Sequence, residues 1–177
     1  MSNWLGHHCT AHGALPGTVT TLARNEEGVF PNRPWTIEFN SRLNCAYIIV
    51  SDAVRLDLRT GELSTLPGLK GLGAGCLSAC GNALICCTSV HTCVWYCLET
   101  GEETVIAGEP DRRGSADGIG GAARFDAPDG IAVTRDGGTA FVADYGSHRI
   151  RRLALHGLEP ATVSTIAGSS ECHCDGV

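Results

Sequence analysis

Three side chains that could take part in acid–base chemistry lie close together in the sequence: Asp144, His148 and Arg149. A histidine near an aspartate can accept and return a proton, as a general acid or base must do. A catalytic site also needs a nucleophile or a metal ion beside that pair, and the surrounding sequence supplies neither. We therefore predict no catalytic residue in this chain.

The ten cysteines are the next candidates for chemistry. Antiparallel pairing of the segments around them would set Cys86 roughly opposite Cys93, at a spacing that suits a disulfide or a shared metal ion. Cysteine also behaves as a small buried hydrophobic residue, and no C-x-x-C pair of the kind typical of zinc sites occurs. We therefore favour buried free thiols. The cysteine-rich stretch contains Cys76, Cys80, Cys86, Cys87, Cys93 and Cys97.

Three other groups could ligate a metal by residue type alone. Histidines and cysteines that suit zinc or copper occur at residues 7–12 and 172–174, but neither group has a second ligand pair at zinc-finger spacing. The segment 109–121 starts a series of aspartates that could bind calcium, yet it lacks the D-x-D-x-D-G pattern, and its glycines can simply allow tight backbone turns. We expect no metal and no cofactor. The aspartates are Asp111, Asp117, Asp126 and Asp129.

A repeated phrase indicates the elements that position these residues. The sequences TGELSTLPG (60–68), TGEETVIAG (100–108) and ATVSTIAG (161–168) resemble one another, and GTVTTLA (17–23) is a partial fourth copy. Repetition at this spacing, with strand-rich sequence between the copies, is typical of propellers and solenoids. Each repeat predicts four short strands joined by tight turns, which is one antiparallel blade. In the third repeat we expect strands at 130–134, 139–144, 148–155 and 162–167.

The segment 104–155 resembles an NHL repeat. It carries an A-G step, a D-G-x-G loop, A-x-F, P-x-G-I-A-V, V-A-D and H-R-I-R, which follow the pattern of that family. The resemblance implies a β-propeller in which the Asp144, His148 and Arg149 set has a structural role, as hydrogen bonds and ion pairs between strands. In the second repeat, Cys87 is expected to replace the aspartate. The matching residues are Ala107, Gly108, Asp117, Gly118, Gly120, Ala123, Phe125, Pro128, 130–133, 142–144 and 148–151.

The predicted architecture is an all-β propeller with an incomplete or open ring, and we interpret the sequence as a fragment of a longer propeller. Closed propellers have about four to eight blades, whereas this sequence predicts about three four-stranded antiparallel blades and a leading strand. Open blades expose apolar faces and unpaired backbone groups, so self-association through open blade edges is a further expectation. We expect a disordered segment at 1–17, blades within 18–168 at about 34–68, 72–108 and 128–168, and the start of a further repeat at 169–177.

Composition limits the functions that this chain could have. With 43% hydrophobic and 18% charged residues it is not a disordered tail, and its formal net charge of −6 makes a nucleic-acid partner unexpected. No apolar run is long enough for a membrane span, and no signal peptide is visible. The absent signal peptide favours the cytoplasm, whereas ten cysteines would also suit a secreted domain, so the compartment stays open.

The function that we predict is a non-catalytic NHL-repeat propeller that binds or scaffolds proteins through its loops. The resemblance also implies two alternatives: a propeller enzyme of the lyase or lactone-hydrolase type, with metal ligands around a central channel, and an RNA-binding propeller with a basic face. The binding residues are expected on the loops that join the strands. Our candidates are Arg112, Arg113 and Tyr145, because arginine and tyrosine commonly anchor interfaces.

Overall fold

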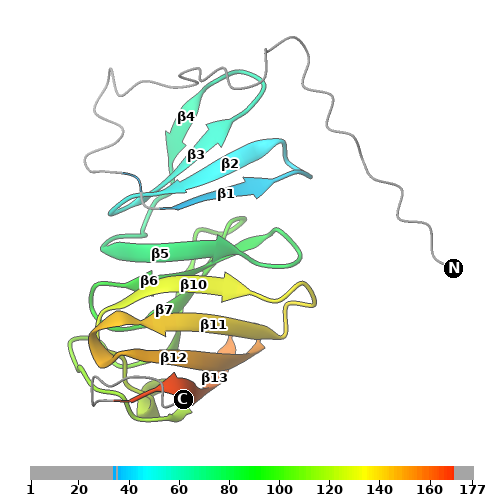
Figure 1. Cartoon of the computed structure of the whole chain (residues 1–177). Helices are drawn as coiled ribbons and strands as arrows, with labels where there is room; N and C mark the ends of the chain where they lie inside the picture. The colour runs from blue at the N-terminus through cyan, green and yellow to red at the C-terminus, as the bar shows by residue number, and fades with distance from the viewer. Residues whose placement is uncertain (1–33, 35, 170–177) are drawn as a thin grey trace, which may run out of the picture.

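The computed structural model describes residue 34 and residues 36–169 of the 177-residue chain. These residues form thirteen β-strands and two short 3-10 helices, and no α-helix occurs among them. The strands make three antiparallel sheets, two with four strands and one with five, which follow one another along the chain (Figure 1). We call these sheets blades 1, 2 and 3.

Blade 1 contains four strands that pair in the order in which they occur in the sequence. Every residue of its second strand is buried, because side chains alternate between the two faces of a strand and both faces of this sheet are covered. The polar side chain of Asn40 accepts hydrogen bonds from the amides of Arg42 and Leu43 and so fixes the first turn. The strands are β1 (Thr36–Asn40), β2 (Cys45–Ile49), β3 (Ala53–Asp57) and β4 (Leu63–Thr65).

Blade 2 repeats this pattern. Its second strand is again buried at every residue, and here cysteine and β-branched side chains fill the positions on both faces. Ser78 takes the place of Asn40, since its hydroxyl accepts a hydrogen bond from the Ala83 amide at 3.1 Å across the first turn. The strands are β5 (Leu72–Leu77), β6 (Ala83–Thr88), β7 (Cys93–Cys97) and β8 (Glu103–Ala107).

Blade 3 has longer outer strands and a fifth, very short strand. That strand, β9 (Gly118–Ile119), lies in the linker (residues 108–127) that joins blades 2 and 3, and it pairs with the outermost strand of blade 3. The linker also holds η1 (Gly120–Ala122). The other elements are β10 (Pro128–Val133), β11 (Thr139–Asp144), η2 (Tyr145–Ser147), β12 (Arg149–His156) and β13 (Glu159–Gly168).

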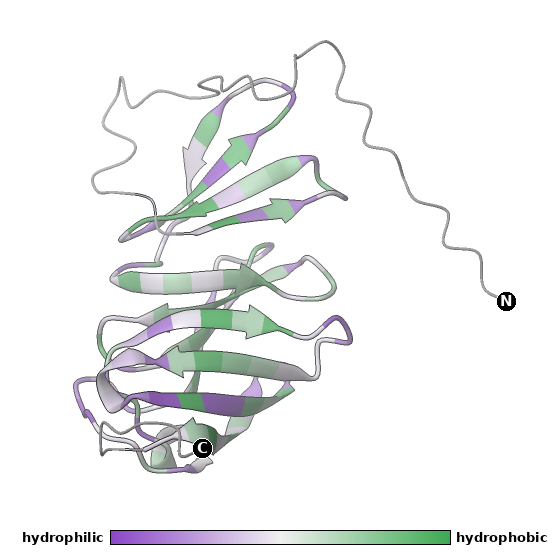
Figure 2. Cartoon of the chain, viewed as in Figure 1, coloured by the Kyte–Doolittle hydropathy of each residue, from purple (hydrophilic) through white to green (hydrophobic). Residues whose placement is uncertain are grey.

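The three blades pack face against face. We call the face of a blade that turns toward the preceding blade its front face and the opposite one its rear face. Tyr47 and Ile49 on the rear of blade 1 share a buried cluster with Tyr96 on the front of blade 2. A second cluster joins Ile85 on the rear of blade 2 to Val142 on the front of blade 3. Figure 2 shows the hydrophobic residues along these strands, interrupted by hydrophilic ones on β12.

The predicted fold class is confirmed. The described chain is all-β, its antiparallel blades are those of a propeller, and the described blades do not close a ring. One predicted strand register was wrong: Cys87, not Cys86, lies opposite Cys93, and Cys86 pairs with Val94. The predicted segments 1–17 and 17–23 lie outside the described residues, as does 169–177 apart from Ser169.

Candidate functional site

A fully buried arginine lies at the centre of blade 3. Arg151 lies on β12, and its side chain projects from the front face of blade 3 and is 0% exposed. Its Nη1 donates to Asp144 Oδ2 and its Nη2 to Asp117 Oδ1, both at 2.9 Å. Burial of a charge is costly unless it is paired and hydrogen-bonded, so both carboxylates help to stabilise this guanidinium inside the protein.

The same arginine holds the linker in place. Its two terminal nitrogens also donate to the carbonyls of Arg124 and Ala116, at 2.8 Å each, and its guanidinium lies 5.1 Å from the centre of the Phe125 ring, within cation–π range. The other oxygen of Asp144 accepts a hydrogen bond from the amide of Asp126 at 2.7 Å. The pair therefore ties the linker to the blade along much of its length.

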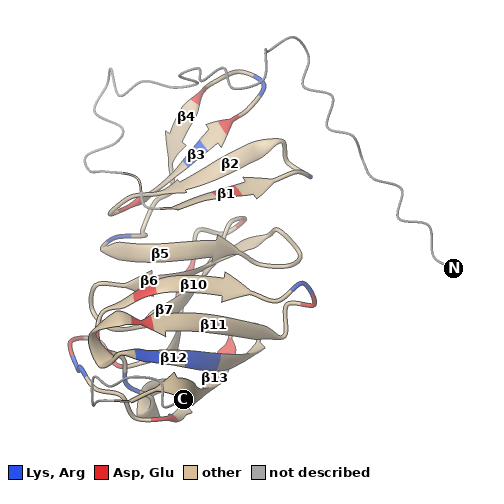
Figure 3. Ribbon diagram, viewed as in Figure 1, with Lys and Arg blue, Asp and Glu red and all other residues tan. Residues whose placement is uncertain are grey.

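Asp117 is the solvent-facing member of this network. Partial burial raises the pKa of its carboxyl, but hydrogen bonds from Thr165 and Arg151 and the positive charge of Arg151 outweigh that effect, so the net pKa lies below the usual value of 3.8. The carboxylate form is therefore stabilised in the folded protein. Figure 3 shows the basic residues concentrated on β12.

The predicted structural role of the Asp144 set thus involves a different partner. Asp144 pairs with Arg151, whereas His148 occupies a left-handed turn with φ of 55° and Arg149 donates to the Ser147 carbonyl. The expected replacement of the aspartate by Cys87 was also wrong. In blade 3, Asp144 pairs with Pro128, just before the bulge of the first strand. The residue at the same place in blade 2 is Thr88, which pairs with Leu72 before the bulge of β5.

Two of the three predicted binding residues lie on neighbouring loops. Arg113 of the linker forms an ion pair with Asp126 at 3.7 Å. The backbone carbonyl of Asp126 accepts a hydrogen bond at 2.7 Å from the amide of Gly146, which follows Tyr145 in η2. The side chain of Arg113 is 70% exposed and Tyr145 is 71% exposed. We call this region, where the linker meets the β6–β7 and β11–β12 turns, the loop end.

Arg112, the third predicted residue, has a separate partner. Its Nη1 lies 2.9 Å from Glu109 Oε2, and the same carboxylate also accepts a hydrogen bond from Arg124. Arg112 therefore lies on the linker with Arg113, but no hydrogen bond or ion pair in the described part of the chain joins it to Tyr145. An exposed pair of this kind contributes little to stability, which leaves Arg112 available to a partner.

The sequence analysis did not identify His91 as part of this region. His91 is buried, and its ring nitrogens face the amide of Ala127 and the Nε of Arg113, each at 3.1 Å. A neutral imidazole accepts at one nitrogen only, so the ring holds one of these donors at a time. The sequence signal was available, because His91 and His148 both precede the third strand of a blade. In the structure both residues have positive φ.

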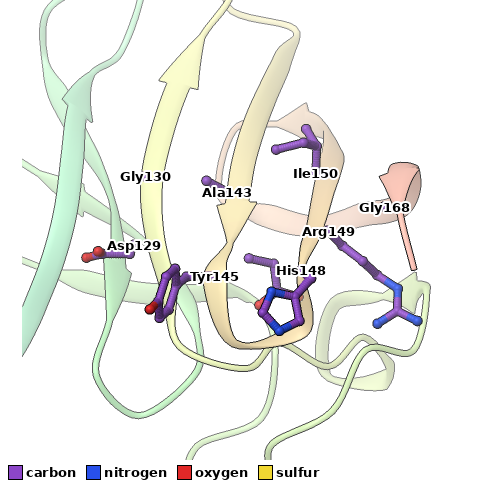
Figure 4. A pocket seen from close by; sticks show the side chains of 9 residues that line it. Asp129, Gly130, Ala143, Tyr145, His148, Arg149, Ile150 and Gly168 are labelled. Carbon is purple, nitrogen blue, oxygen red and sulfur yellow. The ribbon is translucent and has the colours of Figure 1, made fainter. Parts of the chain in front are cut away.

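A hollow of about 360 Å³ opens beside Tyr145. Figure 4 shows the rings of Tyr145 and His148 next to each other, with Asp129 on the far side of the tyrosine. A second hollow of about 330 Å³ includes His148 and Arg149 as well, together with Ser115 of the linker. The first is lined by Asp129, Gly130, Ala143, Asp144, Tyr145, His148, Arg149, Ile150 and Gly168.

The cysteines of blade 2 lie in its core. The Sγ atoms of Cys87 and Cys93 are 3.9 Å apart, both residues are 0% exposed, and the described cysteines are free thiols. The side-chain hydrogen bond with Cys93, followed by burial, raises the pKa of the Cys87 thiol well above its usual value, and burial raises that of Cys86. A thiol held in its neutral form is a weak nucleophile and a weak metal ligand.

The described residues contain no group of three or more His, Cys, Asp or Glu side chains placed to hold a metal ion. Within the calcium-like series, Asp117 and Asp126 already bind Arg151 and Arg113. The histidine and cysteine groups at 7–12 and 172–174 lie outside the described residues. No helix in the described part of the chain is long and apolar enough to span a membrane.

Comparison with solved structures shows the same fold. A Bacteroides thetaiotaomicron protein of unknown function has a TM-score of 0.69 and 20% identity over 85% of this chain and 39% of its own. An auxiliary nutrient-binding protein from Bacteroides ovatus gives 0.62 and 20%, over 76% and 36%. The periplasmic gluconolactonase of Pseudomonas aeruginosa gives 0.51 and 19%, over 77% and 39%. The chain thus covers well under two thirds of each of these proteins.

Comparison with protein families identifies one repeat. The family model described as NHL repeat matches residues 125–153. These residues contain the buried Asp144–Arg151 pair, all of β11 and the first part of β12. No curated protein matches the sequence significantly. With its blades and strand order, the described chain has a β-propeller fold that contains one NHL repeat.

Proposed function

We propose that this chain is a non-catalytic propeller module that binds a protein partner at the loop end of blades 2 and 3. The observation that carries this proposal is the linker held by Arg151. Although the linker contains little regular structure, its backbone is bonded to a buried guanidinium at the carbonyls of Ala116 and Arg124. A surface that is ordered before binding loses less conformational entropy on association.

The exposed side chains at the loop end suit a protein partner. Tyr145 presents a large aromatic ring, and Arg113 presents a guanidinium whose exposed ion pair with Asp126 is long, at 3.7 Å. Residues of these two types anchor protein interfaces more often than others do. Asp129 lines the hollow beside Tyr145, and Asp126 pairs with Arg113, so the surface offers both signs of charge and does not resemble the uniformly basic face that RNA binding requires.

The enzyme alternative is supported by one observation, the likeness in fold to a gluconolactonase at 19% identity. Fold alone does not determine function in propellers. A lactonase of this type would need metal-binding side chains gathered from several blades, and the described residues contain no group of three or more His, Cys, Asp or Glu side chains placed to hold a metal ion. We therefore keep this function as the second candidate, to be tested by lactone hydrolysis with added divalent metal.

The proposal is tested by replacing Arg112, Arg113 and Tyr145 together with alanine. Immobilised protein should lose most of its capture of a protein partner from a lysate of the source cells, at least tenfold, while its melting temperature changes by no more than a few degrees. The small effect on stability is expected because all three side chains are largely exposed.

The matched control carries the same kinds of change at the opposite end of the blades. Arg59, Arg135 and Leu158 are exposed residues of the strand-joining turns there, and their replacement with alanine should leave capture unchanged. The proposal is wrong if the triple variant at the loop end binds as the native chain does. Recovery of RNA that is lost steeply with added salt would favour the nucleic-acid alternative.

A further inference from the structure

A hollow of about 680 Å³ lies between blades 1 and 2. It is lined mainly by the β1–β2, β5–β6 and β7–β8 turns and by the rear face of blade 1, so it opens at the end of the blades that is opposite the loop end. Its volume falls within the range of about 300–1,000 Å³ that is usual for small-molecule sites. Both of the blades that enclose it belong to the described part of the chain.

One wall of the hollow is apolar. Leu66 and Leu98 line it and also pack against the cluster that blades 1 and 2 share, and Tyr47 is a 2%-exposed member of that cluster. Leu43 lines the hollow as well, and its side chain is 55% exposed. An apolar ligand body in this place would cover leucine surface and extend the packing that already joins the two blades.

Two arginines line the hollow, and neither makes a close ion pair. Arg55 projects from the rear face of blade 1, and its ion pair with Asp57 is long, at 3.6 Å. Arg42 Nη1 donates to the Cys80 carbonyl at 3.2 Å, and Arg42 forms no ion pair within the described residues. Glu99 also lines the hollow, but it is an exposed residue of the β7–β8 turn. Both guanidiniums can therefore bind a carboxylate, which their fork geometry suits.

Asn82 adds a hydrogen-bond donor beside the arginines. Its Oδ1 accepts from the Ser78 hydroxyl at 3.4 Å and from the Cys80 thiol, which leaves the amide nitrogen for a ligand. The β1–β2 and β5–β6 turns are also fixed to each other, because Asn40 Nδ2 donates to the Gly81 carbonyl at 2.8 Å. The donors that line the hollow thus lie on turns that are ordered before any ligand arrives.

We propose that this hollow binds a small organic carboxylate with an apolar body. The carboxylate lies toward Arg42, Arg55 and the amide of Asn82, and the apolar body lies on the leucines between the blades. A few polar groups that orient a ligand on an apolar wall are the usual composition of a small-molecule site. This site is separate from the loop end, so it does not depend on the protein-binding function proposed above.

The proposal is tested by titrating the 177-residue chain with octanoate in a calorimeter. Octanoate should bind saturably, with one site per chain. Octanamide has the same apolar body without the charge, and acetate has the charge without the body, so each should bind at least about tenfold more weakly. The proposal is wrong if octanoate does not bind saturably, or if octanamide binds as well as octanoate does.

Substitutions locate the site. Asn82→Asp keeps the oxygen that Ser78 and Cys80 bond to but places a negative charge against the ligand, so octanoate affinity should fall at least about tenfold. Arg42→Met removes an exposed guanidinium and should weaken binding about five- to tenfold. Arg135→Met is the matched control, since Arg135 is an exposed residue of the β10–β11 turn, at the same end of the blades but outside the hollow.

Cys80 gives a second readout that needs no variant. It is exposed and lines the hollow, and the hydrogen bond with Ser78, then that from the Asn82 amide, lower the pKa of its thiol, which favours alkylation. Saturating octanoate should slow the reaction of Cys80 with iodoacetamide, mapped by mass spectrometry, and leave that of Cys97 unchanged. Unchanged alkylation of Cys80, or octanoate binding that survives both Asn82→Asp and Arg42→Met, would overturn this assignment of the site.

Discussion

Blades 2 and 3 share one strand plan but fill the same buried position in different ways. In blade 3 the position holds the ion pair of Asp144 and Arg151, at 2.9 Å. In blade 2 it holds Thr88, whose hydroxyl bonds only to the nearby Thr92 at 2.7 Å, and Val94 in the place of the arginine. A blade of this fold therefore does not need the ion pair for its own packing.

The two blades differ in the segment that leads into them. Residues 66–71 connect blade 1 to blade 2, whereas the much longer linker 108–127 connects blade 2 to blade 3. A long segment with little regular structure has backbone groups that need partners, and Arg151 supplies two of them. This difference between the blades indicates that the buried charges stabilise the linker, and through it the loop end, rather than the sheet.

The largest effect is expected from removing the arginine. Arg151→Met leaves Asp144 buried without its counter-charge, which typically costs about 3–5 kcal/mol, measured as the free energy of unfolding in urea. At the matching position of blade 2, Val94→Met should cost about 1–3 kcal/mol through overpacking alone. Equal losses at the two positions would contradict the difference that we draw between the blades.

A glycine at the start of the linker gives the next largest effect. Gly108 has φ of 88°, and an added Cβ would lie 2.5 Å from the carbonyl oxygen of His91. Gly108→Ala should therefore cost about 2–4 kcal/mol from backbone strain and overlap together. Gly61 has a similar φ of 76° but no atom within 4 Å of the added Cβ, so Gly61→Ala should cost only about 1 kcal/mol. Thermal unfolding of both variants measures the two losses of stability and shows whether that of Gly108→Ala is the larger.

The smallest effect concerns the exposed carboxylate of the network. Because the folded protein lowers the pKa of Asp117, its stabilising effect is present above the usual pKa of 3.8 and is lost as pH falls through the lower folded value. Asp117→Asn should cost about 1 kcal/mol at neutral pH, since the side chain is half exposed and screened by water, and almost nothing near pH 2. A difference in the free energy of unfolding between the native chain and Asp117→Asn that stays constant with pH would contradict a stabilising role of the Asp117 carboxylate.

The fold could be predicted from the sequence because each repeat carries its own strand and turn signals. Tight turns and short apolar strand segments mark each repeat without any knowledge of its neighbours. The register of Cys87 and Cys93 could not be predicted in this way, because the β6–β7 and β11–β12 turns differ in length by one residue. A shift of one residue moves every side chain to the other face of the strand.

The candidate site was predicted only in part for the same reason. Arg113 and Tyr145 were predicted as binding residues by residue type and by their places in loops. The structure ties these loops together through Asp126, and the binding role itself stays a prediction. The partner of Asp144 was missed, because sequence proximity favoured Arg149, whereas the turn η2 sets the phase of β12 so that Arg151 faces inward.

The measurement that tests the central claim most directly is hydrogen–deuterium exchange of the linker. Its amides at Gly114, Ala123 and Arg124 donate to backbone carbonyls within the linker, and we predict that they exchange slowly, as strand amides do. Arg151→Met should make them exchange fast while the amides of β6 and β7 stay protected. Fast exchange of the linker in the native chain, or slow exchange that survives the loss of Arg151, would contradict the account.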